Sequence, residues 1–348
     1  MRVDLFDYFL PAHRIAQEPR PRGTGPLLVL DRASGDATHR QFAELAELLR
    51  PGDLLVRNDV RVRHARLYGR DAQGRLVEIF LLESLDSGRQ RWLALARPGR
   101  RAKQGWSIGL EGGIAAVVEE VRKDGKREVR FDRSVDENLL QRIGHVPLPP
   151  YIHRDPAAPD RPEDRLAYQT VFARKPLAVA APTAGLHFTK EILEQIRRRG
   201  IAIADLTLAV GAGTFRPVMA GDTSGHSLDA EEAFLPAETL ALFRATRREG
   251  GRVVAVGTTV TRALEAAARL PGGLESEQDL RFSTDLFITP GFEFRAIDLL
   301  LTNFHLPRST LLMLVSAFAG RENVLAAYEA AIAADYLFYS YGDAMLIV

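Results

Sequence analysis

The sequence of 348 residues contains no cysteine, and this absence excludes several kinds of chemistry. Disulfide bonds, thiolate nucleophiles and cysteine-ligated zinc or iron–sulfur centres are ruled out. There is also no apolar run of about 18 residues, so we expect no membrane-spanning helix. Asp4 and Asp7 stand where a secretory signal would be apolar, and we therefore expect a cytoplasmic protein.

Several short catalytic signatures are missing as well. The eight histidines are scattered without an HExxH pair, and the sequence has neither a GxSxG turn nor a GxxxxGK[S/T] phosphate loop. We therefore expect no bound metal. The formal net charge of +1 identifies no partner by itself, while 46% apolar residues allow a substantial core and more than one domain.

Most of the chain repeats one pattern, in which an apolar strand is followed by a polar loop with Gly or Pro and then by a helix. Strands are predicted at residues 27–30, 54–56, 177–181, 201–210, 252–256, 285–288, 299–302 and 344–348. Helices are predicted at residues 42–49, 190–199, 258–270, 310–319 and 322–334, with Thr189 as an N-cap. If the strands are parallel, their loops converge on one edge of a sheet. The expected pocket is lined by His187, Thr214, Thr258, Asn303 and His305. The alternative is a set of ordinary strand–helix turns.

Residues 67–131 have a different texture, in which short strand-like runs alternate with turns and helical periodicity is missing. The predicted strands are 75–82, 92–96, 114–121 and 128–131, and residues 134–143 suit one helix. The sequence therefore predicts an α/β main domain, residues 1–66 and 145–348, carrying an inserted all-β, barrel-like domain at residues 67–144.

Positive charge is concentrated at the start of this insertion. Residues 57–105 contain twelve basic and five acidic side chains, a balance of +7, so the remainder carries −6 for a total of +1. Arg97, Arg100, Arg101 and Lys103 crowd one stretch of it. Such a patch is typical of a nucleic-acid contact, although a solvated basic face without a partner is the alternative.

Eight stretches of the sequence resemble the S-adenosylmethionine:tRNA ribosyltransferase-isomerase family of queuosine biosynthesis, in the family's order and over nearly the whole chain. They are residues 58–62 (NDVRV), 144–152 (GHVPLPPYI), 168–171 (YQTV), 180–188 (AAPTAGLHF), 210–215 (VGAGTF), 256–259 (VGTT), 302–311 (TNFHLPRSTL) and 340–345 (SYGDAM). Each match alone is weak, but together they are highly specific.

The resemblance implies a transferase and isomerase that modifies tRNA and uses S-adenosylmethionine as a co-substrate, with no metal. The ribosyl part of S-adenosylmethionine is transferred to the aminomethyl group of a 7-deazaguanine at the wobble position and rearranged. The products are epoxyqueuosine in tRNA, adenine and methionine. The resemblance also implies tRNA as partner, no membrane association and a monomer.

The sulfonium of S-adenosylmethionine acidifies the adjacent 5′ carbon, so a base is needed there, and departing adenine needs a proton donor. His187 and His305 are the candidates for these two roles, unassigned between them; the alternative for each is a histidine that buttresses its loop. The expected S-adenosylmethionine or substrate contacts are Asn58, Asp59, Arg61, Tyr168, Thr183, Gly185, Phe188, Gly211, Gly213, Thr214, Phe215, Thr258, Asn303 and Ser309. The expected tRNA contacts are the four basic residues named above.

Three positions depart from the family pattern. Ala209 and His64 stand where histidine and proline are usual, and residues 229–231 (DAE) replace a usual His-Ser-Glu. The alternative to the enzyme is therefore a divergent paralogue that binds RNA or S-adenosylmethionine without this reaction.

Overall fold

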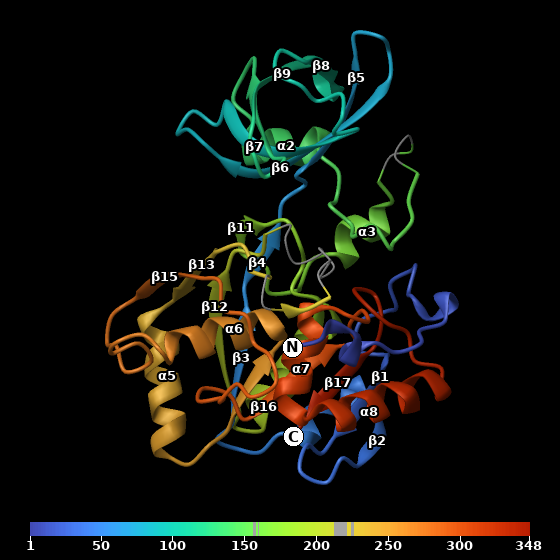
Figure 1. The fold of residues 1–348 in the computed structure, drawn as a ribbon. Coiled ribbons are helices and arrows are strands. Elements are labelled where there is room, and N and C mark those ends of the chain that lie inside the picture. The colour runs from blue at the N-terminus through green and yellow to red at the C-terminus, as the bar shows by residue number, and fades with distance from the viewer. Residues whose placement is uncertain (156–157, 159, 212–220, 224–225) are drawn as a thin grey trace. The chain divides into compact units, whose positions relative to one another are not determined.

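The computed structural model describes residues 1–155, 158, 160–211, 221–223 and 226–348. The chain divides into two compact units, one comprising Met1–Arg61, Gln169–Lys175 and Ala181–Val348, and the other Val62–Tyr168 and Pro176–Ala180. The first contains a large mixed sheet with helices and the second a closed β-barrel (Figure 1). The predicted fold class is confirmed.

The main sheet has nine described strands in the order β15-β13-β12-β3-β14-β16-β17-β1-β2. Their bounds are β1 (Pro26–Leu30), β2 (Ala37–Gln41), β3 (Leu54–Asn58), β12 (Ala202–Leu208), β13 (Glu231–Leu235), β14 (Val253–Val256), β15 (Leu280–Thr284), β16 (Leu299–Asn303) and β17 (Ala344–Ile347). The four central strands β12, β3, β14 and β16 are mutually parallel, while β17 runs antiparallel to β16. This arrangement brings the carboxyl ends of β12, β3, β14 and β16 to one edge.

The helices of this unit follow the strands. They are α1 (Leu45–Leu48), α4 (Lys190–Arg198), α5 (Ala237–Arg248), α6 (Thr258–Ala267), α7 (Thr310–Ala319) and α8 (Arg321–Ala333). Short 3₁₀ turns lie at η1 (Val3–Phe6), η2 (Ala12–Arg14), η3 (Phe42–Glu44) and η5 (Thr183–His187). Thr189 caps α4 as predicted, because its hydroxyl accepts the amide of Ile192 at 3.2 Å.

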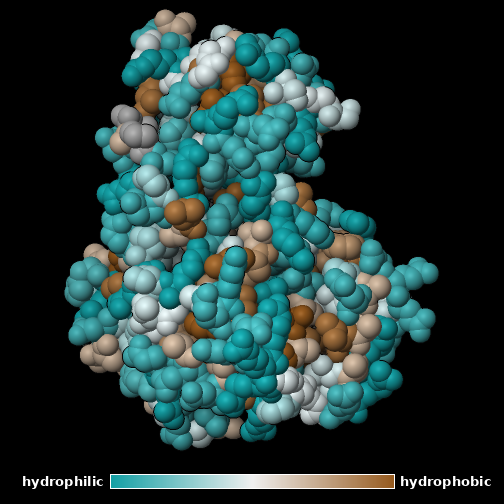
Figure 2. Space-filling model, turned by 180° about the vertical axis from the view of Figure 1, so that it is seen from behind, coloured by the Kyte–Doolittle hydropathy of each residue, from teal (hydrophilic) through white to brown (hydrophobic). Residues whose placement is uncertain are grey.

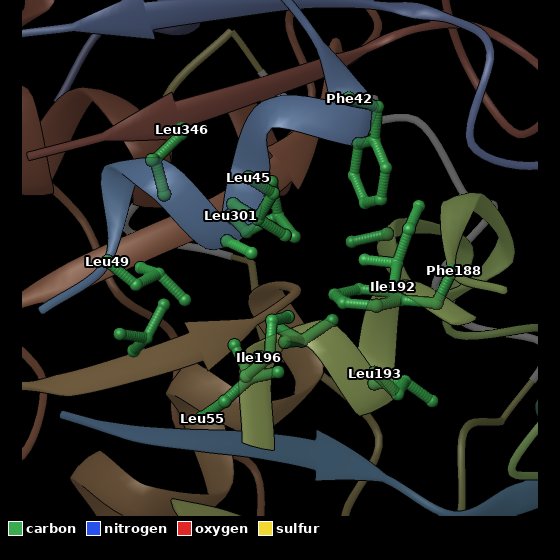
Figure 3. Close-up of a cluster of buried hydrophobic side chains, with 14 of the residues drawn as sticks. Phe42, Leu45, Leu49, Leu55, Phe188, Ile192, Leu193, Ile196, Leu301 and Leu346 are labelled. Atoms are coloured by element: carbon green, nitrogen blue, oxygen red, sulfur yellow. The ribbon is translucent and has the colours of Figure 1, made fainter. Parts of the chain in front are cut away.

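One buried apolar cluster joins α1 and α4 to the sheet (Figure 3). The strands contribute alternate residues, since side chains two apart share a face of a strand. They are Leu55, Val254, Val256, Leu299, Leu301 and Leu346. From α4 and the residue before its cap, Ile192, Ile196 and Phe188 complete the cluster, and Phe188 meets Phe42 edge to face at 5.2 Å. This packing holds the segment from η5 to α4 against the sheet.

The second unit is built on a barrel closed in the order β10-β7-β6-β5-β8-β9, with antiparallel neighbours throughout. Its strands are β5 (Arg66–Asp71), β6 (Leu76–Ser84), β7 (Arg91–Arg97), β8 (Ser107–Leu110), β9 (Ile114–Val121) and β10 (Arg127–Phe131). A turn, η4 (Glu111–Gly113), separates β8 from β9, and the unit also holds α2 (Glu137–Ile143) and α3 (Pro162–Ala167). It is broader than the 67–144 range expected from sequence.

Two predicted strands were wrong. The run at 177–181 does not enter the main sheet; β11 (Lys175–Ala178) pairs instead with β4 (Val60–Val62) in a separate two-stranded sheet. The strand placed at 285–288 lies earlier, at β15, because its pairing with β13 ends at Thr284 opposite Glu231. Sequence patterns also missed β2, β4, β5, β8, β13, α3 and α5.

Candidate functional site

The carboxyl edge of the four parallel strands gathers most of the predicted site residues of the first unit. β3, β14 and β16 end at Asn58, Val256 and Asn303, as the parallel registers require. The loop of η5 also reaches this edge, because η5 packs against β16 even though the strand before it does not join the sheet. Of the four loops expected to converge here, those after Val256 and Asn303 do so, η5 arrives without a strand in the main sheet, and the loop after residue 210 is described only at Gly211.

His187 closes η5 with its ring against Phe42, at 5.0 Å between ring centroids. Its Nε2 is buried and has no hydrogen-bond partner in the described structure. Burial lowers the pKa of His187 to about 4; the adjacent Asn303 side chain opposes this shift and the Arg22 charge adds to it. His187 is therefore a neutral imidazole near pH 7, with a nitrogen available to a ligand.

His305 lies in the loop after β16 and is held more tightly. Its Nε2 is 2.9 Å from the Thr302 hydroxyl, its amide donates to the Tyr328 hydroxyl, and its carbonyl accepts from Tyr8. Burial lowers the pKa of His305 to about 3. The ring is neutral, and its contacts orient it within its own loop.

Two further polar atoms at this edge are buried without a partner in the described structure. Asn303 donates its amide to the Tyr339 carbonyl at 2.8 Å; its side chain also lies beside the His187 ring, whose pKa it raises, but no hydrogen bond of normal geometry reaches its Oδ1. Thr259, in the first turn of α6, has an equally unpartnered hydroxyl. Buried polar atoms are normally satisfied, so together with Nε2 of His187 they point to a ligand.

Other residues predicted to contact the ligand instead form hydrogen bonds within the protein. Asn58 exchanges two hydrogen bonds, both 3.1 Å, with the backbone of Leu208, and Asp59 accepts the Thr207 hydroxyl at 2.7 Å. They tie β3 to β12. Ser309 caps α7 through the Leu312 amide.

Gly185 also has a packing role. A Cβ at this position would lie 2.8 Å from both Cζ of Phe172 and Cγ2 of Thr170, so the absent side chain makes room for the protein's own residues. The neighbouring Thr183 is partly exposed at the start of η5, and Phe188 is fully buried in the apolar cluster. Arg61 is partly exposed in β4, and Tyr168 is fully buried after α3.

The glycine-rich stretch after β12 is described only at its start. The Gly211 amide donates to Oε1 of Glu231 at 3.0 Å, and Arg262 donates Nη1 to Oε2 of the same carboxylate at 2.5 Å. Gly213, Thr214 and Phe215 lie outside the described residues. Sequence reasoning did not select Glu231 and Arg262, although Glu231 is the one acid of the aligned His-Ser-Glu triplet that this chain retains.

Asp343 is a third residue that the sequence did not single out, although it lies in the 340–345 stretch. It precedes β17, whose first residue pairs with Asn303, and is 1% exposed. Its Oδ2 accepts the Leu337 amide at 2.7 Å, and its Oδ1 is 3.4 Å from Nε of Arg20. Burial raises the pKa of Asp343 to about 6, against the lowering effects of these two partners. A proton can therefore be gained or lost here near neutral pH.

The basic residues of the second unit form a separate group. Arg97 ends β7, and Arg100, Arg101 and Lys103 follow in the loop to β8; all four are exposed. In the described part of the chain none of them forms an ion pair, whereas Arg91 and Arg130 on the same barrel both pair with Glu119. Their charges remain available to an anionic partner.

Neither a metal centre nor a single membrane-spanning helix occurs among the described residues. The described residues hold no group of three or more His, Asp or Glu side chains suited to a metal ion. Across the same part of the chain, no single helix has the length and apolar character to cross a membrane. The bent pair α7 and α8, at 112°, meets those criteria only when taken together.

Comparison with known proteins matches the chain from end to end. The model of the family described as queuosine biosynthesis protein covers residues 3–347. A relative from Thermosipho africanus, described as S-adenosylmethionine:tRNA ribosyltransferase-isomerase, is 46% identical over 348 residues, with 100% of both chains covered. A relative from Heliobacterium modesticaldum with the same description is 49% identical over 352 residues, again with full coverage of both.

A solved structure is similar over the same extent. It is the crystal structure of S-adenosylmethionine tRNA ribosyltransferase from Thermotoga maritima, which has a TM-score of 0.56 and 39% sequence identity to this chain. The match covers 99% of this chain and 100% of that one.

Proposed function

Because the chain belongs to the queuosine biosynthesis protein family over its whole length, we propose that it is an S-adenosylmethionine:tRNA ribosyltransferase-isomerase. It transfers the ribosyl part of S-adenosylmethionine to the aminomethyl-deazaguanine at the wobble position of tRNA and isomerises it. Epoxyqueuosine in tRNA, adenine and methionine are the products. The protein acts as a monomer in the cytoplasm, where its tRNA substrate is found.

The observation that supports a site in the first unit is the set of unpartnered buried atoms at the carboxyl edge of the sheet. His187, Thr259 and Asn303 each present one such atom, and all three belong to segments that follow the parallel strands or pack against them. Ligands of open α/β sheets bind at this edge. We place S-adenosylmethionine here, against η5 and the first turn of α6.

Proton transfer in this site has two candidate groups, and a third titratable side chain positions its own loop. His187 is neutral and has an available nitrogen, so it is placed to accept the proton from the carbon next to the sulfonium. His305, whose ring nitrogen already meets Thr302, orients the loop beside it. Asp343, whose pKa of about 6 is nearer to neutral, is placed to store or deliver a proton.

Contact with tRNA is assigned to the inserted barrel domain, residues 67–144. Its four exposed and unpaired cations, Arg97, Arg100, Arg101 and Lys103, suit phosphate groups.

The experiment is a single-turnover incubation with S-adenosylmethionine and tRNA that carries the aminomethyl-deazaguanine, with the same tRNA bearing guanine as control. We expect adenine and free methionine in equal amounts, and only with the modified tRNA. Formation of S-adenosylhomocysteine would instead show methyl transfer. Binding without turnover would show a paralogue that has lost the reaction.

A further inference from the structure

Helix α6 begins at the carboxyl edge without a cap. Gly257, at φ 94° and ψ 159°, precedes it, and no side chain accepts from its first turn. The first helical hydrogen bond runs from the Thr261 amide to the Gly257 carbonyl, so in the described structure the amides of residues 258–260 have no acceptor. Such a start carries partial positive charge, but by itself it does not make a binding site.

Arg262 supplies an independent observation. Only 7% of it is exposed; Nε donates to the Leu286 carbonyl at 3.0 Å and Nη1 to Glu231, but Nη2 is buried and has no partner in the described structure. Helical side chains lean toward the helix amino terminus, so Arg262 points back over the turn that holds Thr258 and Thr259. This lean directs the guanidinium toward the uncapped end of the helix.

The Thr259 hydroxyl near the start of α6 can also donate a hydrogen bond, and the neighbouring carboxylate is already engaged. The Thr259 hydroxyl is buried and unpartnered. Glu231, the carboxylate that pairs with Arg262, has both oxygens engaged, by the Gly211 amide and by Arg262 itself. Three amides, a hydroxyl and a guanidinium nitrogen without an acceptor thus belong to the first five residues of α6, and such a set of donors suits an anion.

The distance between the start of α6 and His187 indicates which kind of anion can bind there. Ala184 of η5 lies close to Gly257, since a Cβ built on the glycine would be 3.6 Å from Cβ of Ala184. A small ligand can therefore reach both His187 and the start of α6. Thr258 and Arg262 are each 7% exposed, which favours the terminal group of such a ligand over the backbone of a polynucleotide.

We propose that Arg262, Thr259 and the first-turn amides of α6 bind the carboxylate of the methionyl group of S-adenosylmethionine. This inference rests on the proposed function. One oxygen of the planar carboxylate accepts a hydrogen bond from Nη2 of Arg262, and the other accepts from the helix amides and the Thr259 hydroxyl. The sulfonium and ribose then extend toward His187, and Glu231 acts through Arg262 by holding its guanidinium in place.

The test compares S-adenosylmethionine with its decarboxylated analogue by calorimetry. The natural protein should bind S-adenosylmethionine about 10- to 100-fold more tightly, the range expected for charged hydrogen bonds. Arg262→Met combined with Glu231→Gln, which leaves no buried charge unpaired, should bind the two ligands almost equally. Thr259→Val should reduce the preference to a smaller extent without touching the ion pair.

Arg247→Met is the matched control, because Arg247 pairs with Asp298, which accepts the Val253 amide at the start of β14, the end of that strand opposite to α6. It should keep the full preference, and circular dichroism will establish that each variant is folded. An unchanged preference in both site variants overturns the carboxylate assignment. A flatter salt dependence of tRNA binding in the Arg262 double variant also overturns it, in favour of a phosphate. If the natural protein binds neither ligand, the proposed function itself fails.

Discussion

At the scale of single residues, the two histidines of the edge are neutral groups: His305 is buried, and His187 is half-buried with its Nε2 enclosed. Both have a folded-state pKa below the unfolded value of 6.5, about 4 for His187 and about 3 for His305. Between pH 6.5 and the folded pKa, the unfolded chain therefore binds more protons than the native protein. The stability that the two neutral histidines contribute is fully present above pH 6.5 and is lost as the pH falls toward their folded-state pKa values.

A His305→Gln variant tests this linkage. Each such histidine contributes up to about 1.4 kcal/mol of lost stability per pH unit, so the natural protein should lose roughly 2 kcal/mol more than the variant between pH 6.5 and 5. Urea unfolding at the two pH values measures the difference. Asp343, whose raised pKa acts in the opposite sense, is present in both proteins and cancels in the comparison. Equal losses would mean that His305 is not buried as a neutral ring.

Ala209 is the residue-scale departure most open to experiment. Its amide donates to the Glu232 carbonyl at 2.9 Å, just beyond the end of β12, at the position where the sequence resemblance leads us to expect histidine. Losing a general acid or base typically costs about 10²–10⁴ in rate, but losing an orienting hydrogen bond costs only about 0.5–1.5 kcal/mol. The other motifs are present, so we expect an orienting role for the usual histidine.

Ala209→His should then change the single-turnover rate with saturating tRNA by no more than ~10-fold, which corresponds to about 1.4 kcal/mol. Ala209→Gln serves as a control for side-chain size. A natural protein that is inert, together with an active Ala209→His variant, would contradict this expectation and show that the chain has left the family's chemistry.

At the scale of elements, the loop between β7 and β8 presents cations that the barrel does not neutralise. Arg100→Glu with Arg101→Glu should weaken tRNA binding and flatten its salt dependence by about two units of log–log slope, one for each lost phosphate contact. Binding is measured by filter retention or anisotropy over a series of salt concentrations.

The control changes the net charge equally elsewhere on the barrel. Arg130→Glu with Arg133→Glu alters two arginines that already pair with Glu119 and Asp132. This pair of changes should affect the slope much less. Equal slopes in the loop variant and the natural protein would identify the loop as a solvated basic face.

At the scale of the whole molecule, the chain leaves its first unit after Arg61, builds the barrel and returns by Gln169. The face in Figure 2 is largely hydrophilic with small apolar patches. Two of the most exposed apolar side chains of the described residues, Phe9 and Leu166, belong to different units. The total charge of +1 is nearly neutral because the basic segment at residues 57–105 is balanced by an excess of acidic residues in the rest of the chain.

The sequence by itself determined the features that depend on neighbouring residues. The bounds predicted for α7 match the structure, and Thr189 caps α4, because helical periodicity and caps act over a few residues. The strands β12, β14 and β16 were found for the same reason, as apolar runs between loops. The family motifs located the carboxyl edge.

Only the tertiary structure decided which polar atoms of that edge remain unsatisfied. Asn58 forms its hydrogen bond with Leu208, 150 residues away, and Arg262 forms its ion pair with Glu231, 31 residues away. No local sequence pattern encodes such partners. The strand predicted at 285–288 failed similarly, since pairing with β13 rather than apolar content set its position. Burial then made His187 neutral, raised the pKa of Asp343 and left Nη2 of Arg262 without an acceptor, because desolvation depends on everything packed around a group.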